Sequence, residues 1–392
     1  MKQLIIKGPK VYAEDKILNN ADILIEESII KKIGKINSNQ NTEKINILEF
    51  PNNYHLVPGF IDMHIHGAAG ADVMDATDDA LETISSELLK EGVTSFLPTV
   101  MTGDLNKINH AIKNIANYKN NKGAQILGIN LEGPFLSKEK NGAQPIEQLL
   151  TPNIELIKKW QKLSNNLIKI VTIAPELPNA LEAIKYLQEN NIIAALGHSN
   201  ADYEAAKIAI KLGSKYATHL FNCMPPIHHR KPGLISALLL DNNVTTEIIA
   251  DGIHLHPAII ELIVKLKGFD NTILVSDAMR AKNLADGNYT LSEQKVIVKN
   301  NEARLQNNAL AGSTLRLDTA IRNIINYTNC SLFDVLKMVT ANPAKKLNIF
   351  DRKGSIAIGK DADLVVLDES LQVKLTLRGT ASPRYIWPQH YV

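Results

Sequence analysis

The sequence predicts an α/β fold, in which a barrel of eight parallel strands and helices of the TIM type lies beside a small β domain. Two observations predict it. Between residues 57 and 353 the chain alternates short apolar, β-rich runs with longer segments of helical periodicity. The flanking segments, 1–56 and 354–392, instead carry short β runs separated by Asn, Asp and Gly. We therefore expect a barrel domain over 57–353 and a small β domain built from both ends of the chain.

Eight apolar runs are the candidate barrel strands, because strands of a parallel sheet are buried on both faces and read as continuous hydrophobic segments. They cover 59–66, 93–100, 126–131, 170–174, 192–197, 215–219, 246–250 and 272–276. Helical spacing lies between or after them over 178–190, 201–212, 257–267 and 332–339. In an earlier helix Asp78 is expected to cap the start and Gly92 to end it. In the small β domain, runs over 3–6, 21–25 and 29–33 are expected to join a run over 363–368.

Composition and charge exclude several classes of protein. Among 392 residues, 43 Lys and Arg balance 41 Asp and Glu, so a net charge of +2 gives no field that attracts nucleic acid or a membrane surface. Any anionic ligand must therefore be held by a local site. No apolar run approaches the ~20 residues that a bilayer requires, and no signal peptide is recognised. Two cysteines, Cys223 and Cys330, fit a reducing cytoplasm.

Five of the candidate strands end in, or are followed at once by, side chains of metal-binding types. These residues are His64, His66, Glu132, His198, His219 and Asp277. The C-terminal ends of barrel strands surround one mouth, so these side chains are expected to converge there. Each has a structural alternative, such as an ion pair for Glu132 or a helix cap for Asp277. Together they predict an open site for zinc, iron or manganese.

Motifs along the whole chain resemble the amidohydrolase superfamily. They are PGFIDMHIHG from Pro58, LEGPFL from Leu131, LGHS from Leu196, THLFNCMPP from Thr218, ADGIH from Ala250, VSDA from Val275, LAGS from Leu310 and GKDADL from Gly359. The LEGP and HLFNxM runs are more specific and resemble deacetylases of 6-phosphorylated acetamido sugars. The resemblance implies a distorted barrel with a small β-sandwich, and metal-dependent hydrolysis of N-acetylglucosamine 6-phosphate to glucosamine 6-phosphate and acetate.

The resemblance also implies roles for the strand-end residues. Glu132, His198 and His219 would bind the principal divalent metal, and Asp277 would act as general base and then general acid. His64 and His66 would add a second metal site, giving one or two ions per chain. One departure concerns Gln144, because members that use one metal carry a histidine there, which helps to polarise the acetyl carbonyl. We hypothesise that here the second metal polarises the carbonyl and that Gln144 is a hydrogen-bond donor.

The substrate contacts follow from the same resemblance. Asn222, the backbone of Cys223, Arg230 and His254 would hold the phosphate, with some of these groups supplied by a neighbouring subunit of a homodimer. The sugar pocket would be formed by Ala143, Gln144, Asp251, His254, Leu310, Ala311 and Gly312. The side chain of Cys223 is expected to serve packing. His228 and His229 are adjacent in a Pro-rich loop and are not expected to bind metal.

Three alternatives stay open at this point. The substrate could be N-acetylgalactosamine 6-phosphate, since the two sugars differ in the orientation of one hydroxyl group. Another amidohydrolase, acting on cyclic amides or as a deaminase, would often bridge two metals with a carboxylated lysine, where this chain has Glu132. A non-catalytic binding protein would be expected to have lost a ligand or the acid/base residue, yet all of them are present.

Overall fold

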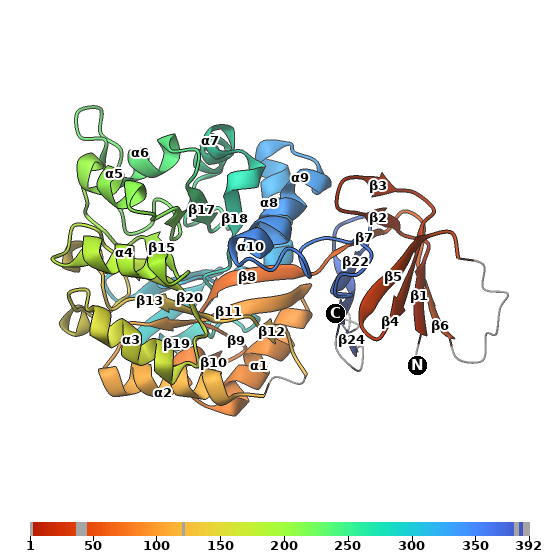
Figure 1. Ribbon diagram of the computed structural model, residues 1–392, viewed down its shortest axis with the longest axis horizontal. Coiled ribbons are helices and arrows are strands. Elements are labelled where there is room, and N and C mark those ends of the chain that lie inside the picture. The colour runs from red at the N-terminus through yellow and green to blue at the C-terminus, as the bar shows by residue number, and fades with distance from the viewer. Residues whose placement is uncertain (1–2, 37–44, 120–121, 380–383, 387–392) are drawn as a thin grey trace.

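The computed structural model describes residues 3–36, 45–119, 122–379 and 384–386. The barrel occupies one side of the molecule and the small β-rich part occupies the other (Figure 1). Among the described residues, no helix is both long and apolar enough to cross a bilayer.

The eight predicted strands form a nearly closed parallel barrel, which confirms the predicted fold class. In order they are β8 (Phe60–Ile65), β11 (Val93–Met101), β13 (Ile129–Glu132), β14 (Ile168–Ile173), β15 (Ile193–Leu196), β16 (Tyr216–Ala217), β17 (Thr245–Ile248) and β18 (Thr272–Leu274). β12 (Gln125–Ile126) also pairs with β11. A single parallel bridge between Ile65 and Ala278 brings the end of the first strand beside the segment that follows the last.

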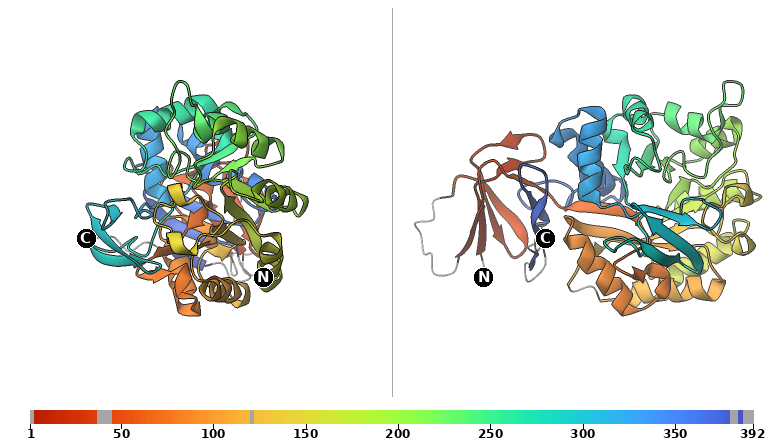
Figure 2. Two further views of the ribbon diagram at one scale, coloured as in Figure 1. Left: turned by 90° about the vertical axis from the view of Figure 1, so that its left-hand side faces the viewer. Right: turned by 180° about the vertical axis from the view of Figure 1, so that it is seen from behind.

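Helices cover the outside of the barrel (Figures 1 and 2). They are α1 (Asp78–Leu89), α2 (Leu105–Asn117), α3 (Ile154–Leu163), α4 (Ala180–Glu189), α5 (Tyr203–Lys211), α6 (Gly233–Leu240), α7 (Pro257–Lys267), α8 (Leu317–Thr328), α9 (Leu332–Val339) and α10 (Ala341–Lys346). The predicted cap of α1 was wrong by one residue. Thr77 is the N-cap, because its side chain accepts from the amide of Ala80, while Asp78 lies in the first turn.

Both ends of the chain contribute to the small β-rich part. One sheet has the order β5 (Ile29–Gly34), β4 (Asp22–Glu26), β1 (Gln3–Lys7), β6 (Ile45–Glu49). The other has the order β24 (Arg384–Ile386), β23 (Val373–Arg378), β22 (Leu364–Leu367), β7 (His55–Pro58), β2 (Lys10–Tyr12), β3 (Ile17–Leu18). Side chains of the two sheets share one hydrophobic cluster, in which Ile23 and Leu364 are fully covered. We propose that this cluster is the core of the second domain, with boundaries near residues 56 and 354.

A three-stranded antiparallel sheet follows the last barrel strand and was not predicted. It consists of β19 (Gly287–Leu291), β20 (Gln294–Lys299) and β21 (Glu302–Leu305), and it lies against the barrel in Figure 2. Its inner face packs on Met101 and Met279, and Gln294 donates a hydrogen bond to the carbonyl of Ala143. The sheet thereby places Leu291 at the wall of the cavity described below.

Candidate metal and catalytic site

The predicted metal-binding side chains converge at the C-terminal ends of the strands, as expected for a barrel of this type. Three of them follow their strands in left-handed backbone, with φ of 46° at His198, 25° at His219 and 46° at Asp277. This conformation is uncommon for residues with a side chain, and such strain concentrates at functional sites. The left-handed turns thus coincide with residues whose side chains converge at the barrel mouth.

The first group joins Glu132, His198 and His219. Oε1 of Glu132 lies 3.0 Å from Nε2 of His198 and 2.9 Å from Nε2 of His219, and the two Nε2 atoms are 3.1 Å apart. Nδ1 of His198 lies 2.9 Å from the carbonyl oxygen of Lys140, which can only accept a hydrogen. A neutral His198 therefore carries its lone pair on Nε2, toward the other two ligand atoms.

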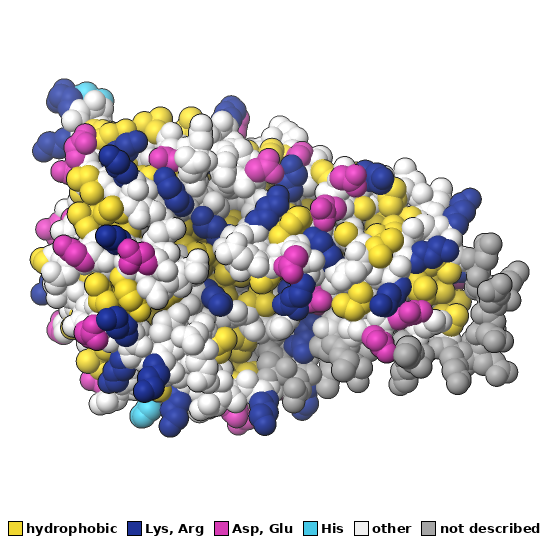
Figure 3. Space-filling model, viewed as in Figure 1, with side chains coloured by type: hydrophobic (Ala, Val, Ile, Leu, Met, Phe, Trp, Pro, Cys, Tyr) yellow, Lys and Arg dark blue, Asp and Glu magenta, His cyan; other side chains and the backbone are white. Residues whose placement is uncertain are grey.

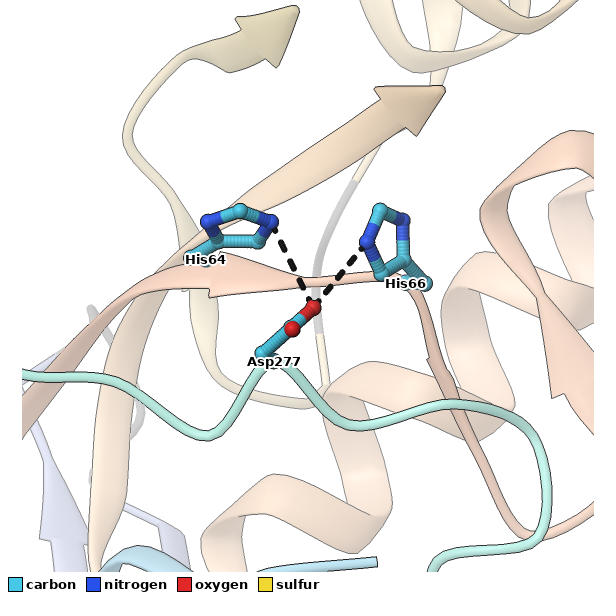
Figure 4. A group of neighbouring side chains, drawn as sticks. All are labelled: His64, His66 and Asp277. Atoms are coloured by element: carbon cyan, nitrogen blue, oxygen red, sulfur yellow. Dashed lines mark ion pairs between the residues drawn. The ribbon is translucent and has the colours of Figure 1, made fainter. Parts of the chain in front are cut away.

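The second group joins His64, His66 and Asp277. Oδ1 of Asp277 lies 3.5 Å from Nε2 of His64 and 3.2 Å from Nε2 of His66. Figure 4 shows the two imidazole rings turned toward this one carboxylate oxygen. Glu132 bridges the groups, because its oxygens also lie 3.5 Å from Nε2 of His64 and 3.3 Å from Nε2 of His66.

The donor set fits divalent cations. Nε2 of His64 is buried without a hydrogen-bond partner, although two carboxylates surround it. Burial by itself lowers the pKa of His66, but hydrogen bonds to Asp277 and Glu132 raise it to about 9. For the carboxyl group of Glu132 burial has the opposite effect and raises the pKa. The charges of His64 and His198 outweigh it and hold the pKa of Glu132 well below its usual range. The cluster thus stabilises positive charge at its centre, and imidazole with carboxylate suits zinc, iron or manganese.

Gln144 contacts the first group directly. Its Nε2 donates a hydrogen bond of 2.7 Å to Oε2 of Glu132, and its Oε1 accepts one of 2.9 Å from the amide of Thr102. In this structure Gln144 thus donates to a carboxylate of the predicted metal site, and its hypothesised role as a hydrogen-bond donor beside a second metal stays a prediction. A buried side chain held at both ends fixes the direction of the carboxylate that it contacts.

A cavity of about 240 Å³ opens beside both groups. Of the predicted substrate residues, those that line it are Ala143, Gln144, Asn222, Cys223, His254, Leu310 and Gly312. Asp251 and Ala311 are not among the lining residues. The carboxylate of Asp251 instead lies behind His254, with its Oδ2 2.6 Å from Nδ1 of that ring. Gly142 leaves space for Sγ of Cys223, because a Cβ at this glycine would come within 2.5 Å of the sulfur.

Arg230 is not brought into the cavity of its own chain. It lies on the exposed loop between β16 and α6, which projects from the barrel in Figure 1. Basic and histidine side chains gather at this projection in Figure 3. The rings of His228 and His229 are 4.3 Å apart, and Nε2 of His229 lies 2.6 Å from the Arg230 guanidinium. Neither histidine belongs to a metal-ligand group among the described residues.

The profile of the family described as "Amidohydrolase family" matches residues 55–390. The chain belongs to the amidohydrolase family. This family is metal-dependent, which agrees with the two ligand groups. A Bacillus subtilis relative, "N-acetylglucosamine-6-phosphate deacetylase", is 42% identical over 381 residues, 96% of each chain. An Escherichia coli O157:H7 relative, "N-acetylgalactosamine-6-phosphate deacetylase", is 34% identical over 94% of this chain and 96% of its own.

A solved amidohydrolase has the same fold over nearly the whole chain. The structure of N-acetylglucosamine-6-phosphate deacetylase from Pasteurella multocida superposes with a TM-score of 0.90 at 29% identity. The superposition covers 98% of this chain and 100% of the other. The barrel and the small β-rich part are therefore both present in a related enzyme.

Sequence reasoning missed several residues of this amidohydrolase site. Met101, Leu291 and Ala309 line the cavity, and the inserted three-stranded sheet that contributes Leu291 carries no motif. Glu247 was missed although a signal was present. It is an acidic residue inside the β-branched apolar run of the seventh strand, and only a buried partner accounts for a carboxylate at such a position.

Proposed function

We propose that this chain hydrolyses the acetamide bond of N-acetylglucosamine 6-phosphate with water, releasing glucosamine 6-phosphate and acetate. The observation that carries the proposal is the pairing of two buried metal-ligand groups with a cavity of about 240 Å³ that His254 also lines. The Bacillus subtilis and Pasteurella multocida relatives, which match 96% and 98% of this chain, bear the name of this activity.

The metal would be zinc, iron or manganese, with Glu132, His198 and His219 holding the principal ion and His64 and His66 a second. Divalent ions held there would supply a water of lowered pKa and a polarised acetyl carbonyl, since water is a poor nucleophile and an amide a poor electrophile. The carboxylate of Glu132 lies within 3.5 Å of His64, His66 and His219, and so contacts ligands of both groups.

Asp277 would move the proton. Its carboxylate is the part of the second group that lines the cavity beside His66, and its backbone is fixed by hydrogen bonds to His64 and Ser313. It would accept a proton from the attacking water and then deliver it to the nitrogen of the departing amine, which leaves poorly as an anion. Residues 275–286, which follow β18, form no helix. Asp277 therefore has no helix to cap.

The phosphate would be bound by Asn222, the backbone of Cys223 and His254, all of which belong to residues that line the cavity. Hydrogen bonding and the charge of Asp251 outweigh burial and raise the pKa of His254, which favours the cationic form of the ring. We further propose a cytoplasmic homodimer in which Arg230 of one subunit reaches the phosphate of the other. The exposed position of Arg230, outside its own cavity, supports this arrangement.

Acetate release from purified protein tests the proposal, with N-acetylglucosamine 6-phosphate, its galacto epimer and unphosphorylated N-acetylglucosamine as the three substrates. We expect release from the first, preference over the epimer, and a large loss without phosphate. Elemental analysis should find one or two divalent ions per chain. The Asp277→Asn variant, which keeps the shape of the side chain, should lose about 10²–10⁴-fold in kcat. Absence of acetate release from N-acetylglucosamine 6-phosphate by metal-replete protein overturns the proposal.

A further inference from the structure

Glu247 contacts a member of each metal-ligand group from a strand that supplies no predicted ligand. It lies on β17, its residue is only 1% exposed, and its Oε2 is 3.2 Å from Nδ1 of His64. The same oxygen accepts a hydrogen bond of 3.2 Å from the backbone amide of His219. One carboxylate oxygen thus lies between a ring of the second group and the backbone of the first.

The contact with His64 decides which ring nitrogen is free to bind a cation. A carboxylate accepts a hydrogen, so the ring of His64 presents Nδ1–H to Glu247 and keeps a lone pair on Nε2. That Nε2 atom lies 3.5 Å from Oε1 of Glu132 and 3.5 Å from Oδ1 of Asp277. Carboxylates behind metal-binding histidines fix the tautomer and the ring direction in this way.

The ligand groups differ in how their histidines are held. His198 donates from Nδ1 to the carbonyl of Lys140, whereas Nδ1 of His66 and Nδ1 of His219 have no partner among the described residues. His64 is the histidine of the second group whose outer nitrogen faces a buried carboxylate. In the second group, Glu247 therefore holds the outer nitrogen of His64, while the outer nitrogen of His66 has no partner among the described residues.

The contact with His219 supports a strained turn. His219 has a φ of 25°, and the amide of the next residue, Leu220, donates a hydrogen bond of 2.9 Å to the backbone oxygen of Glu247. Glu247 thus binds two consecutive amides of this turn, one through its side chain and one through its backbone. Such contacts are needed to maintain left-handed backbone at a residue with a Cβ.

We propose that Glu247 is a positioning residue that couples the two metal sites, by orienting His64 for the second ion while holding the turn that carries His219 for the first. This inference rests on the proposed metal centre. It adds to that centre a residue of the seventh strand, Glu247, which would position ligands without binding metal or substrate itself. Removing the carboxylate should weaken metal binding at both sites, and most strongly at the site that includes His64.

Metal affinity of folded variants tests the proposal. Glu247→Gln keeps an oxygen that can accept both hydrogen bonds but removes the charge, while Glu247→Ala removes both contacts. Thr246→Val is the matched control, because Thr246 is an equally buried neighbour on the same strand, with its hydroxyl directed to the carbonyl of Asn271. The measurements are divalent ions per chain by elemental analysis, zinc dissociation constants by competition with a chelating dye, and thermal unfolding of metal-free protein.

We expect zinc dissociation constants to rise about 10–100-fold in Glu247→Ala, less in Glu247→Gln, and not in Thr246→Val. The Michaelis constant for the sugar phosphate should change little, and excess zinc should restore kcat in Glu247→Gln. Wild-type affinity and stoichiometry in folded Glu247→Gln and Glu247→Ala would refute the positioning role while leaving the proposed function intact. If wild-type protein binds no divalent ion, the proposed metal centre itself fails.

Discussion

Gln144 and Glu132 are joined by a hydrogen bond of 2.7 Å between the side-chain amide of one and Oε2 of the other. The opposite end of Gln144 accepts from the amide of Thr102, so the glutamine side chain is fixed at both ends. Glu132 in turn lies within 3.5 Å of all four histidines of the site. The orientation of the central carboxylate thus depends on an uncharged residue that binds no metal.

Replacing Gln144 by Leu, which has a similar shape, should weaken the metal site. One oxygen of Glu132 then loses its amide donor, and we expect a loss of about 10–100-fold in metal affinity, with a fall in kcat. Chelator competition and acetate release measure the two effects. Gln188→Leu, on the exposed side of α4, is the control. Unchanged metal affinity in Gln144→Leu would show that Glu132 is oriented by other contacts.

The second metal site is tested by replacing His64 and His66 together with Gln. These two rings supply both nitrogen ligands of the second group. We therefore expect the double variant to bind one ion fewer per chain, as measured by elemental analysis, and to lose most of kcat. His110→Gln is the control, since this histidine is exposed on α2 and belongs to neither ligand group. Full activity of the double variant at one ion per chain contradicts a role for the second ion.

Asp251 should set the pH range over which phosphate is bound. Burial lowers the pKa of His254, but the hydrogen bond and charge of Asp251 outweigh burial and raise it. In Asp251→Asn the burial remains and the charge is lost, so the ring should lose its proton at lower pH than in wild type. Loss of the cation weakens phosphate binding, so the Michaelis constant of the variant should begin to rise at lower pH.

The measurement is the Michaelis constant for N-acetylglucosamine 6-phosphate from about pH 5.5 to 8.5 in both proteins, a range that spans the ordinary titration of histidine. Ionisation of the phosphate itself affects both proteins equally and cancels in the comparison. The pH profile of kcat should move less, because Asp251 does not line the cavity. Superimposable Michaelis-constant profiles would mean that the His254 charge does not contribute to phosphate binding.

Arg230 should act on the site of a second subunit. Arg230→Ala should raise the Michaelis constant for phosphorylated sugar and leave activity on the unphosphorylated sugar unchanged, because a guanidinium pairs with phosphate oxygens. The decisive step mixes this variant with Asp277→Asn under conditions that exchange subunits. A mixed dimer then contains one site with an intact Asp277 and a partner Arg230, so activity at low substrate should return. No recovery in verified mixed dimers places Arg230 outside the partner's site.

The barrel was predictable because its strands are buried on both faces and read as apolar runs, and Glu132, His198 and His219 follow those runs directly. The three-stranded sheet over 287–305 was not predicted, because its short, partly exposed strands lack the continuous apolar runs that identified the barrel strands. Val296 and Val298 on β20 do alternate with exposed residues, as in a half-buried strand. Contacts between side chains from distant strands, such as Glu247 with His64, depend on the closure of the barrel and cannot be derived from the spacing of residues in one strand.

Stability should depend on a buried ion pair behind the site. The side chains of Lys282 and Glu91 pair with neither of them exposed, and Glu91 also accepts a hydrogen bond of 3.0 Å from the amide of Leu317. Lys282 lies in the segment that follows Asp277, so the pair connects this segment to the end of α1. Lys282→Met leaves the carboxylate buried without its cation, and we expect the free energy of unfolding to fall by about 3–5 kcal/mol.

Urea unfolding of metal-free protein measures the effect without a contribution from bound ions. The double variant Lys282→Met with Glu91→Leu should recover much of the loss, because it removes the unpaired charge along with its partner. Lys107→Met is the control: its pair with Glu293 is exposed, and its loss should cost about 1 kcal/mol or less. If Lys282→Met costs no more than Lys107→Met, water or another group neutralises Glu91, and the pair does not hold the segment after Asp277 in place.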